Sequence, residues 1–177
     1  MNYFKLVFLI SLIISSRFLS QTSGSSTVSI NLPVVTLMDI EPTGAISMNF
    51  TAPTEAGRPI LSPATNTTKW INYTSAIASG GVTRRITASI NTVIPGIDIK
   101  ILAATASGSG GGTLGIPSAQ ITLNTTAQTI ISGIGGAFTG NGANNGHQLT
   151  ISLSANTYAN LSARTNNPVV ITYTITE

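Results

Sequence analysis

Apolar and polar residues alternate with a period of two along most of the chain. In the stretch from Ser26 to Pro42, the even positions from Val28 to Ile40 are apolar except for Thr36. This alternation predicts β-strands with one face in a core and the other in water, as in antiparallel sheets. The same pattern occurs at residues 46–50, 82–90, 97–103, 149–154 and 169–176, with shorter candidates near Trp70, Ile121 and Ile130.

Turns rich in Gly, Pro and Asn separate these segments. The clearest breaks are PTEAGRP from Pro53, SGSGGGTLGIP from Ser107 and TGNGANNG from Thr139. No apolar pattern of helical period and no repeat of fixed length is present, which argues against helices and solenoids. We therefore expect an all-β fold, an immunoglobulin-like antiparallel β-sandwich of about eight or nine strands. A closed barrel is the alternative.

The chain is expected to have three parts. Residues 1–20 are typical of a secretory signal peptide, because Lys5 precedes an apolar run, Leu6–Ile14, that is too short to span a bilayer. Cleavage is placed after Ser20, with Ser16 as the alternative site. Residues 21–33 form an N-terminal donor arm or an edge strand, and residues 34–177 form the sandwich domain. The protein is thus expected to be secreted or held at the cell surface without spanning the membrane.

Composition excludes several functions. The chain has no Cys, which rules out disulfides, thiolate metal sites, a cysteine nucleophile and a lipid-anchored cysteine. Without Lys5 and Arg17, six basic residues face five acidic ones, and the basic residues are scattered. A nucleic-acid partner is therefore not expected, because such a partner requires a basic patch.

Candidate catalytic groups are few. His147, the only His, lies in a turn before a strand, where a surface position is expected, and no G-x-S-x-G motif accompanies it. Asp39 and Glu41 have the same parity and could lie close together, but an acidic strand end before a turn is the expected explanation, in preference to a catalytic carboxylate pair. The GGGTLG motif from Gly110 is followed by a strand pattern instead of a helix, so a flexible loop is expected. We predict no enzyme activity, no catalytic residue, no cofactor and no metal site.

Arg84 is the unusual residue of the strand pattern. It has the parity of Val82 and Ile86, so it is expected to point toward the core or its rim. A buried Arg is costly unless it is paired, and the predicted partners in a structural ion pair are Asp39 and Glu41. A side chain that extends to solvent and a ligand contact are the alternatives.

Trp70 and Tyr73 have opposite parity, so at least one of them is expected to face the core. Core packing is the prediction for Trp70. The alternative is a sugar-stacking platform that also includes Tyr158.

The stretch TVSINLPVVTLMDIEPTG, from Thr27 to Gly44, resembles the mature N-terminus of the Cys-less major subunits of colonisation-factor (alpha-type) chaperone–usher fimbriae. The signal peptide, the size and the alternating C-terminal strand are further shared features. The chain is also similar in style to uncharacterised secreted β-sandwich proteins of Bacteroidetes.

The resemblance implies a structural subunit of a fimbria or adhesin-like filament on the surface of a Gram-negative bacterium. One subunit's N-terminal strand would complete the sheet of the next, and the chain would form a homopolymer with the help of a periplasmic chaperone and an outer-membrane usher. The inserting side chains would be Val28, Ile30 and Leu32, followed by Val34, and Pro33 would mark the join with the subunit's own strand. The alternative is a secreted, monomeric β-sandwich module that binds a glycan or another surface ligand through its loops.

Overall fold

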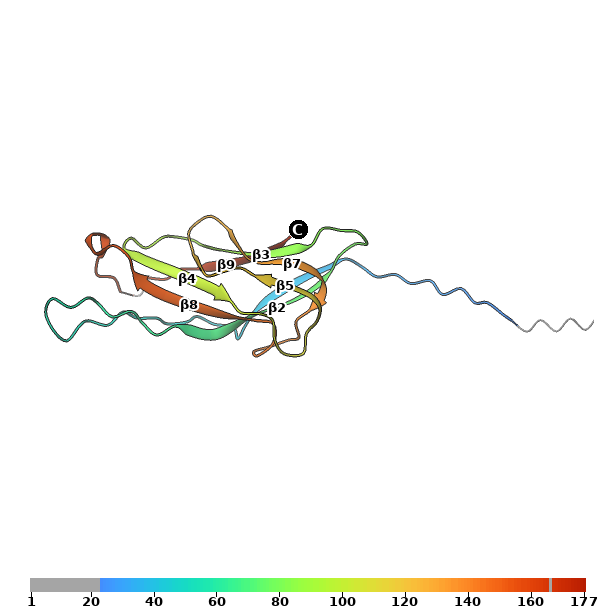
Figure 1. Ribbon diagram of the computed structural model, residues 1–177, viewed down its shortest axis with the longest axis horizontal. Helices are drawn as coiled ribbons and strands as arrows, with labels where there is room; N and C mark the ends of the chain where they lie inside the picture. Colours follow the sequence, from blue (N-terminus) through green and yellow to red (C-terminus); the bar gives the residue numbers. More distant parts are fainter. Residues whose placement is uncertain (1–22, 166) are drawn as a thin grey trace, which may run out of the picture. The chain divides into compact units, whose positions relative to one another are not determined.

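The computed structural model describes residues 23–165 and 167–177, in which Pro33–Glu177 forms one compact unit (Figure 1). The predicted signal peptide lies outside the described residues. The described part contains nine strands, all paired antiparallel, and one short 3-10 helix, η1. The elements are β1 (Val35–Glu41), β2 (Asn66–Ala76), β3 (Arg84–Ile90), β4 (Ile97–Ala103), β5 (Gly111–Pro117), β6 (Ile121–Thr122), β7 (Gln128–Phe138), β8 (His147–Ala155), η1 (Tyr158–Asn160) and β9 (Ile171–Thr176). No helix among the described residues has the length and apolar character needed to cross a bilayer.

The strands form two layers that share a continuous hydrogen-bonded ladder. One layer has the order β1-β2-β8-β4-β6 and the other has the order β5-β7-β3-β9. They join where Thr74 and Ser75 of β2 pair with Phe138 and Ala137 of β7. The prediction of an all-β, antiparallel, sandwich-like fold with eight or nine strands is confirmed.

The alternating pattern produces the core directly. In β3, burial alternates residue by residue from Arg84 to Ile90, and β4 buries Ile99, Ile101 and Ala103 while Lys100 remains half-buried. The fully buried apolar side chains are mostly isoleucines: Ile71, Ile86, Ile101, Ile130, Ile131 and Ile134, together with Leu149. β-branched side chains suit this role because they pack well on a pleated surface.

Two segments differ from the sequence prediction. Residues 46–50 belong to no strand, although Ile46 and Met48 pack against the core as their parity predicts. The Gly-rich run expected as a flexible loop contains β5. Glycine is required there because a Cβ at Gly112, where φ is +88°, would lie 2.2 Å from the carbonyl oxygen of Gly136 on β7. The run therefore allows two backbones to approach closely, which a turn-based interpretation of glycine overlooks.

Candidate functional site

Two strands leave one edge unpaired on the same side of the sandwich. Among residues 23–165 and 167–177, β1 pairs only with β2, and β9 pairs only with β3. Their unpaired edges come near each other, but no ladder joins them. We call this region the β1–β9 seam. An unpaired strand edge presents a row of free N–H and C=O groups that can accept another strand.

Apolar side chains along the seam are only partly covered. In Val169–Thr176, which contains β9, every second side chain packs against the core and the side chains between them are exposed. From the other side, β1 and the segment that follows it supply side chains in the same half-buried state. The seam side chains are Met38, Ile40, Ile46, Met48, Val169, Ile171, Tyr173 and Ile175. The core therefore reaches the surface along this line.

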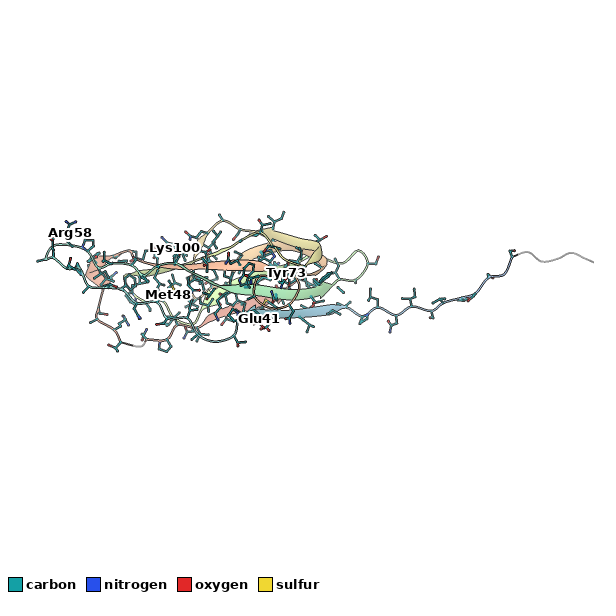
Figure 2. All side chains as sticks on the ribbon, turned by 90° about the horizontal axis from the view of Figure 1, so that it is seen from below. Glu41, Met48, Arg58, Tyr73 and Lys100 are labelled. Atoms are coloured by element: carbon teal, nitrogen blue, oxygen red, sulfur yellow. The ribbon has the colours of Figure 1, made fainter. Side chains whose placement is uncertain are left out.

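Lys69 fixes the turn that follows β1 through two hydrogen bonds to its backbone. It has the parity of Ile71, which places its side chain on the core-facing side of β2, and its Nζ donates hydrogen bonds to the carbonyl oxygens of Pro42 and Gly44, the latter at 2.7 Å. Figure 2 shows Met48 on the side of Glu41 that faces away from the N-terminal segment. Among the described residues, the backbone of residues 45–50 makes no hydrogen bond to other backbone groups, so this segment continues the chain after β1 without joining a ladder.

Arg84 holds together the end of the seam at which β1 begins. The side chain is buried, and its Nη1 donates to the carbonyl oxygen of Val35 at 2.6 Å and to the hydroxyl of Ser75 at 2.8 Å. Its Nη2 lies 3.5 Å from the carboxylate of Glu177, just after β9. One guanidinium thus contacts both β1 and the end of the chain that continues β9.

The carboxylate partner of Arg84 differs from the predicted ones. Asp39 and Glu41 pair with Asn72 and Trp70 of β2, four and six positions beyond the Val35 backbone that Arg84 contacts. Their parity also places them on the outer face of β1, away from the core. Parity correctly predicted that Arg84 points inward. It gave no information about the carboxylate partner, which is Glu177 at the end of the chain.

The segment that precedes β1 carries the predicted inserting side chains. Val28, Ile30 and Leu32 are 76%, 86% and 81% exposed, and residues 23–32 belong to no strand in the described part of the chain. Val34 is also exposed. Isolated exposed apolar residues are common, but a regular apolar face on an unpaired segment is typical of a binding segment.

His147 is buried and does not lie at the surface as expected. Its Nδ1 donates to the carbonyl oxygen of Ala104 at 2.8 Å, and its Nε2 lies 3.0 Å from the hydroxyl of Tyr73. That hydroxyl donates its single hydrogen to the carbonyl oxygen of Leu114. Burial lowers the pKa of His147 and raises the pKa of Tyr73. The residue starts β8 as predicted, but its parity continues through Leu149 and Ile151 into the core.

The buried imidazole makes folding sensitive to acid. The unfolded chain binds a proton at His147 near the ordinary pKa of about 6.5, whereas the folded chain resists protonation because burial lowers the pKa. Between these two pKa values the unfolded state binds more protons, so the free energy of unfolding falls as the pH decreases from about 7. Urea denaturation from pH 7 to pH 5 should show this decrease, and the slope should be smaller in His147→Gln. Equal slopes in both proteins would contradict the assignment.

Trp70 faces outward, and the prediction that it packs in the core is wrong. Tyr73 occupies the core position instead, at 3% exposed (Figure 2). Trp70 is half-buried on the outer face of β2, where it pairs with Glu41 on one side and Gln148 on the other. Neither observation supports a platform formed by Trp70, Tyr73 and Tyr158 together.

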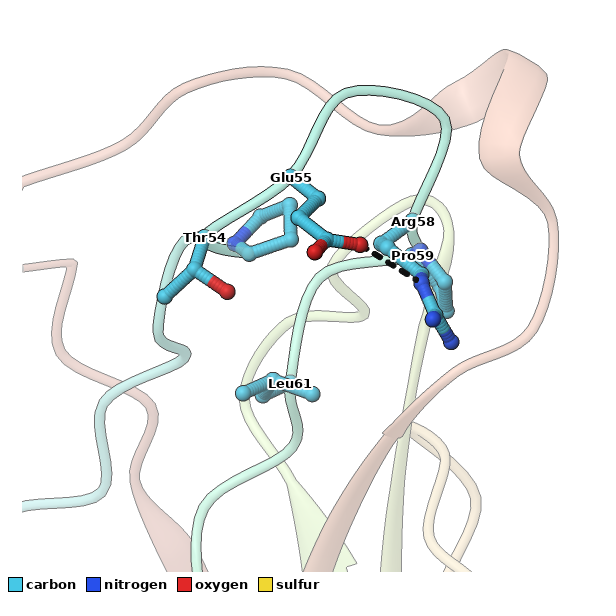
Figure 3. A pocket seen from close by; sticks show the side chains of 6 residues that line it. Thr54, Glu55, Arg58, Pro59 and Leu61 are labelled. Atoms are coloured by element: carbon cyan, nitrogen blue, oxygen red, sulfur yellow. Dashed lines mark ion pairs between the residues drawn. The ribbon is translucent and has the colours of Figure 1, made fainter.

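A shallow pocket lies in the loop between β1 and β2 (Figure 3). Its lining includes Pro53, Pro59 and Leu61, and an ion pair of 3.5 Å between Arg58 and Glu55 crosses it. Within residues 23–165 and 167–177, no group of three or more His, Asp or Glu side chains is placed to hold a metal ion.

Known proteins provide no closer guide to this site. No family model matches the chain, and searches of the curated proteins and of the solved structures found no significant match. The seam, with its two unpaired edges and partly covered apolar side chains, is therefore interpreted from its own geometry.

Proposed function

We propose that the protein is a structural subunit of a cell-surface filament, assembled by insertion of residues 28–34 into the β1–β9 seam of a neighbouring copy. The observation that carries the proposal is the seam itself, where unpaired strand edges border half-buried apolar side chains. A strand added along the free edge of β9 would satisfy its row of backbone groups and cover part of the exposed core, which is the physical basis of strand-addition complexes.

The inserting segment matches the seam in length and spacing. Val28, Ile30, Leu32 and Val34 place four apolar side chains on one face over seven residues. Val169–Ile175 presents four half-buried apolar side chains with the same spacing. Since each buried aliphatic side chain contributes roughly 1.5–3 kcal/mol, three or four insertions would supply the main apolar contribution that offsets the entropy cost of association.

The link between the segment and β1 favours a neighbour over the same chain. To fill its own seam beside β1, the segment would have to reverse direction at Pro33 and Val34. Tight two-residue hairpins require positive φ, yet the ring of Pro33 fixes φ near −65° and Val34 is β-branched. Insertion into another copy requires no such turn. Export through a chaperone and usher is what the fimbrial resemblance adds to this proposal.

Deletion of the inserting segment tests the proposal. We expect the chain that starts at Gln21 to form filaments visible by electron microscopy, and the chain that starts at Pro33 to remain a folded monomer. A peptide spanning Thr27–Val34 should bind the shorter chain and raise its Tm. The control is the same peptide with Ser at positions 28, 30 and 32, which should leave the Tm unchanged.

Two results would argue against the filament. One is a strictly monomeric and stable chain starting at Gln21. The other is a chain starting at Pro33 that cannot fold and is not rescued by the peptide, because this would show that residues 21–32 belong to the protein's own core.

A further inference from the structure

The loop between β7 and β8 contains two Asn–Gly steps. They are Asn141–Gly142 and Asn145–Gly146, within the TGNGANNG stretch that begins at Thr139. An Asn that precedes Gly is chemically labile, because no side chain hinders attack by the Gly backbone nitrogen on the side-chain carbon Cγ of the Asn. Gly also tolerates the backbone conformations that this close approach requires. Since both steps have the same sequence, their local structure decides which of them reacts.

Hydrogen bonds hold the step at Asn145 away from this reaction. The N–H of Gly146, which would have to attack, donates to the carbonyl oxygen of Ser107 at 2.9 Å. The Oδ1 of Asn145 accepts from the N–H of Ser109 at 3.0 Å, and its Nδ2 donates to the carbonyl oxygen of Asn141 at 2.8 Å. Gly146 is also buried. This step must therefore break several contacts before its nitrogen can reach Cγ.

The step at Asn141 is free of such contacts. The side chain of Asn141 is exposed, and a Cβ added to Gly142 would meet nothing within 4 Å. Within residues 23–165 and 167–177, no hydrogen bond engages the Asn141 side chain or the Gly142 N–H. The φ of Gly142 is +84°, a left-handed conformation that Gly adopts readily. The attacking nitrogen and the carboxamide of this step can therefore approach each other in the folded protein.

We propose that Asn141 is a site of spontaneous modification, converted by water to Asp and isoaspartate in the folded protein, while Asn145 is protected. The Gly142 nitrogen bonds to Cγ of Asn141, the Cγ–Nδ2 bond breaks, and ammonia leaves with the proton of the Gly142 N–H. Water then opens the succinimide ring that results. Opening at Cγ gives Asp, and opening at the backbone carbonyl carbon gives isoaspartate.

The conversion changes a contact that the loop makes with the sheet. The carbonyl oxygen of Asn141 accepts from the side chain of Asn145, whose own carbonyl oxygen accepts a hydrogen bond of 2.7 Å from the buried Asn72 on β2. Isoaspartate adds one carbon to the backbone and turns the carbonyl group of Asn141 into a free carboxylate. Both products add a negative charge to a chain in which only 7% of the residues are charged, so isoelectric focusing separates the modified molecules.

Mass spectrometry of aged protein tests the proposal. The chain that starts at Gln21 is incubated at pH 8 in native buffer and, in parallel, in concentrated urea, and fragmentation between Ala143 and Asn144 distinguishes the two steps. In native buffer, conversion at Asn141 should be at least about tenfold faster than at Asn145, because the hydrogen bonds of the second step must open first. In urea the two rates should become similar, since these hydrogen bonds are lost.

The matched control is Asn141→Gln, because a longer side chain forms the corresponding ring much more slowly. This variant should lose the acidic species that the natural chain develops in native buffer. The rate at Asn144, which precedes Asn and not Gly, gives the background. Three results would overturn the proposal: native conversion at Asn145 as fast as at Asn141, native conversion at Asn141 no faster than at Asn144, or an acidic species that persists in Asn141→Gln. None of them bears on the insertion of residues 28–34, which filament formation tests separately.

Discussion

Replacement of Ile30 with Asp is expected to abolish filament assembly while leaving the sandwich folded. Ile30 is the central apolar side chain of the inserting segment and is 86% exposed, so the change removes nothing from the subunit's own core. In the seam, the variant loses roughly 2 kcal/mol of apolar burial and places a carboxylate against apolar side chains at a similar further cost. A total of about 4 kcal/mol corresponds to an affinity roughly 1,000-fold weaker.

The matched control for this variant is Ser29→Asp, one position away on the other face of the segment. Because parity directs Ser29 to solvent in the inserted strand, the control should assemble nearly as the natural chain does. Sedimentation and electron microscopy of the chain starting at Gln21 measure both. Equal loss of assembly in the two variants would show that charge alone, and not insertion of Ile30, controls the association.

Replacement of Arg84 with Ala is expected to give the largest loss of folding stability. The change leaves the carbonyl of Val35 and the hydroxyl of Ser75 without their buried donor and opens a cavity beside them. A cost of about 2–4 kcal/mol is expected, because each buried acceptor left without a donor costs about 1–3 kcal/mol. Urea denaturation measures it best in the Ile30→Asp background, where assembly does not add to the apparent stability.

Two neighbouring changes define what Arg84 contributes. Arg85→Ala removes the exposed neighbour on the other face and should alter stability by less than about 0.5 kcal/mol. Glu177→Gln removes a partner that is mostly exposed and 3.5 Å away, so its effect should be similarly small. A large loss in Glu177→Gln would instead show that the ion pair, and not the hydrogen bonds to Val35 and Ser75, holds this end of the seam.

Much of the fold could be predicted because parity along each strand is a local property. Val82–Ile90 alternates so regularly that the inward direction of Arg84 followed from sequence alone. Its complete burial did not follow, because the sequence left open a side chain that extends to solvent. Parity failed where a neighbour decides the outcome. Trp70 and Tyr73 lie on opposite faces of β2, and the sequence favours neither face as the buried one. Only the position of the second layer determines which of the two side chains is covered.

The seam itself was beyond prediction because an unpaired edge is a property of the whole topology. The sequence indicated that Val169–Ile175 is a strand, but not that β3 would be its sole partner. Likewise, the alternation in residues 46–50 predicted a strand paired in a sheet. In the structure, Ile46 and Met48 pack against the core, but the segment belongs to no strand. Side-chain spacing reports which face of a segment is buried and carries no information about its backbone partners.

The position of β3 has a consequence for folding during synthesis. β3 lies between β7 and β9, so one of its edges stays bare until Ile171–Thr176 has left the ribosome, long after Arg84–Ile90 has. Pairings between such distant parts of the chain form slowly, because a long loop must close before any contact compensates for its entropy. One edge of this apolar strand therefore has no neighbour until β9 is available, and the chain's quickest route to aggregation lies in that interval.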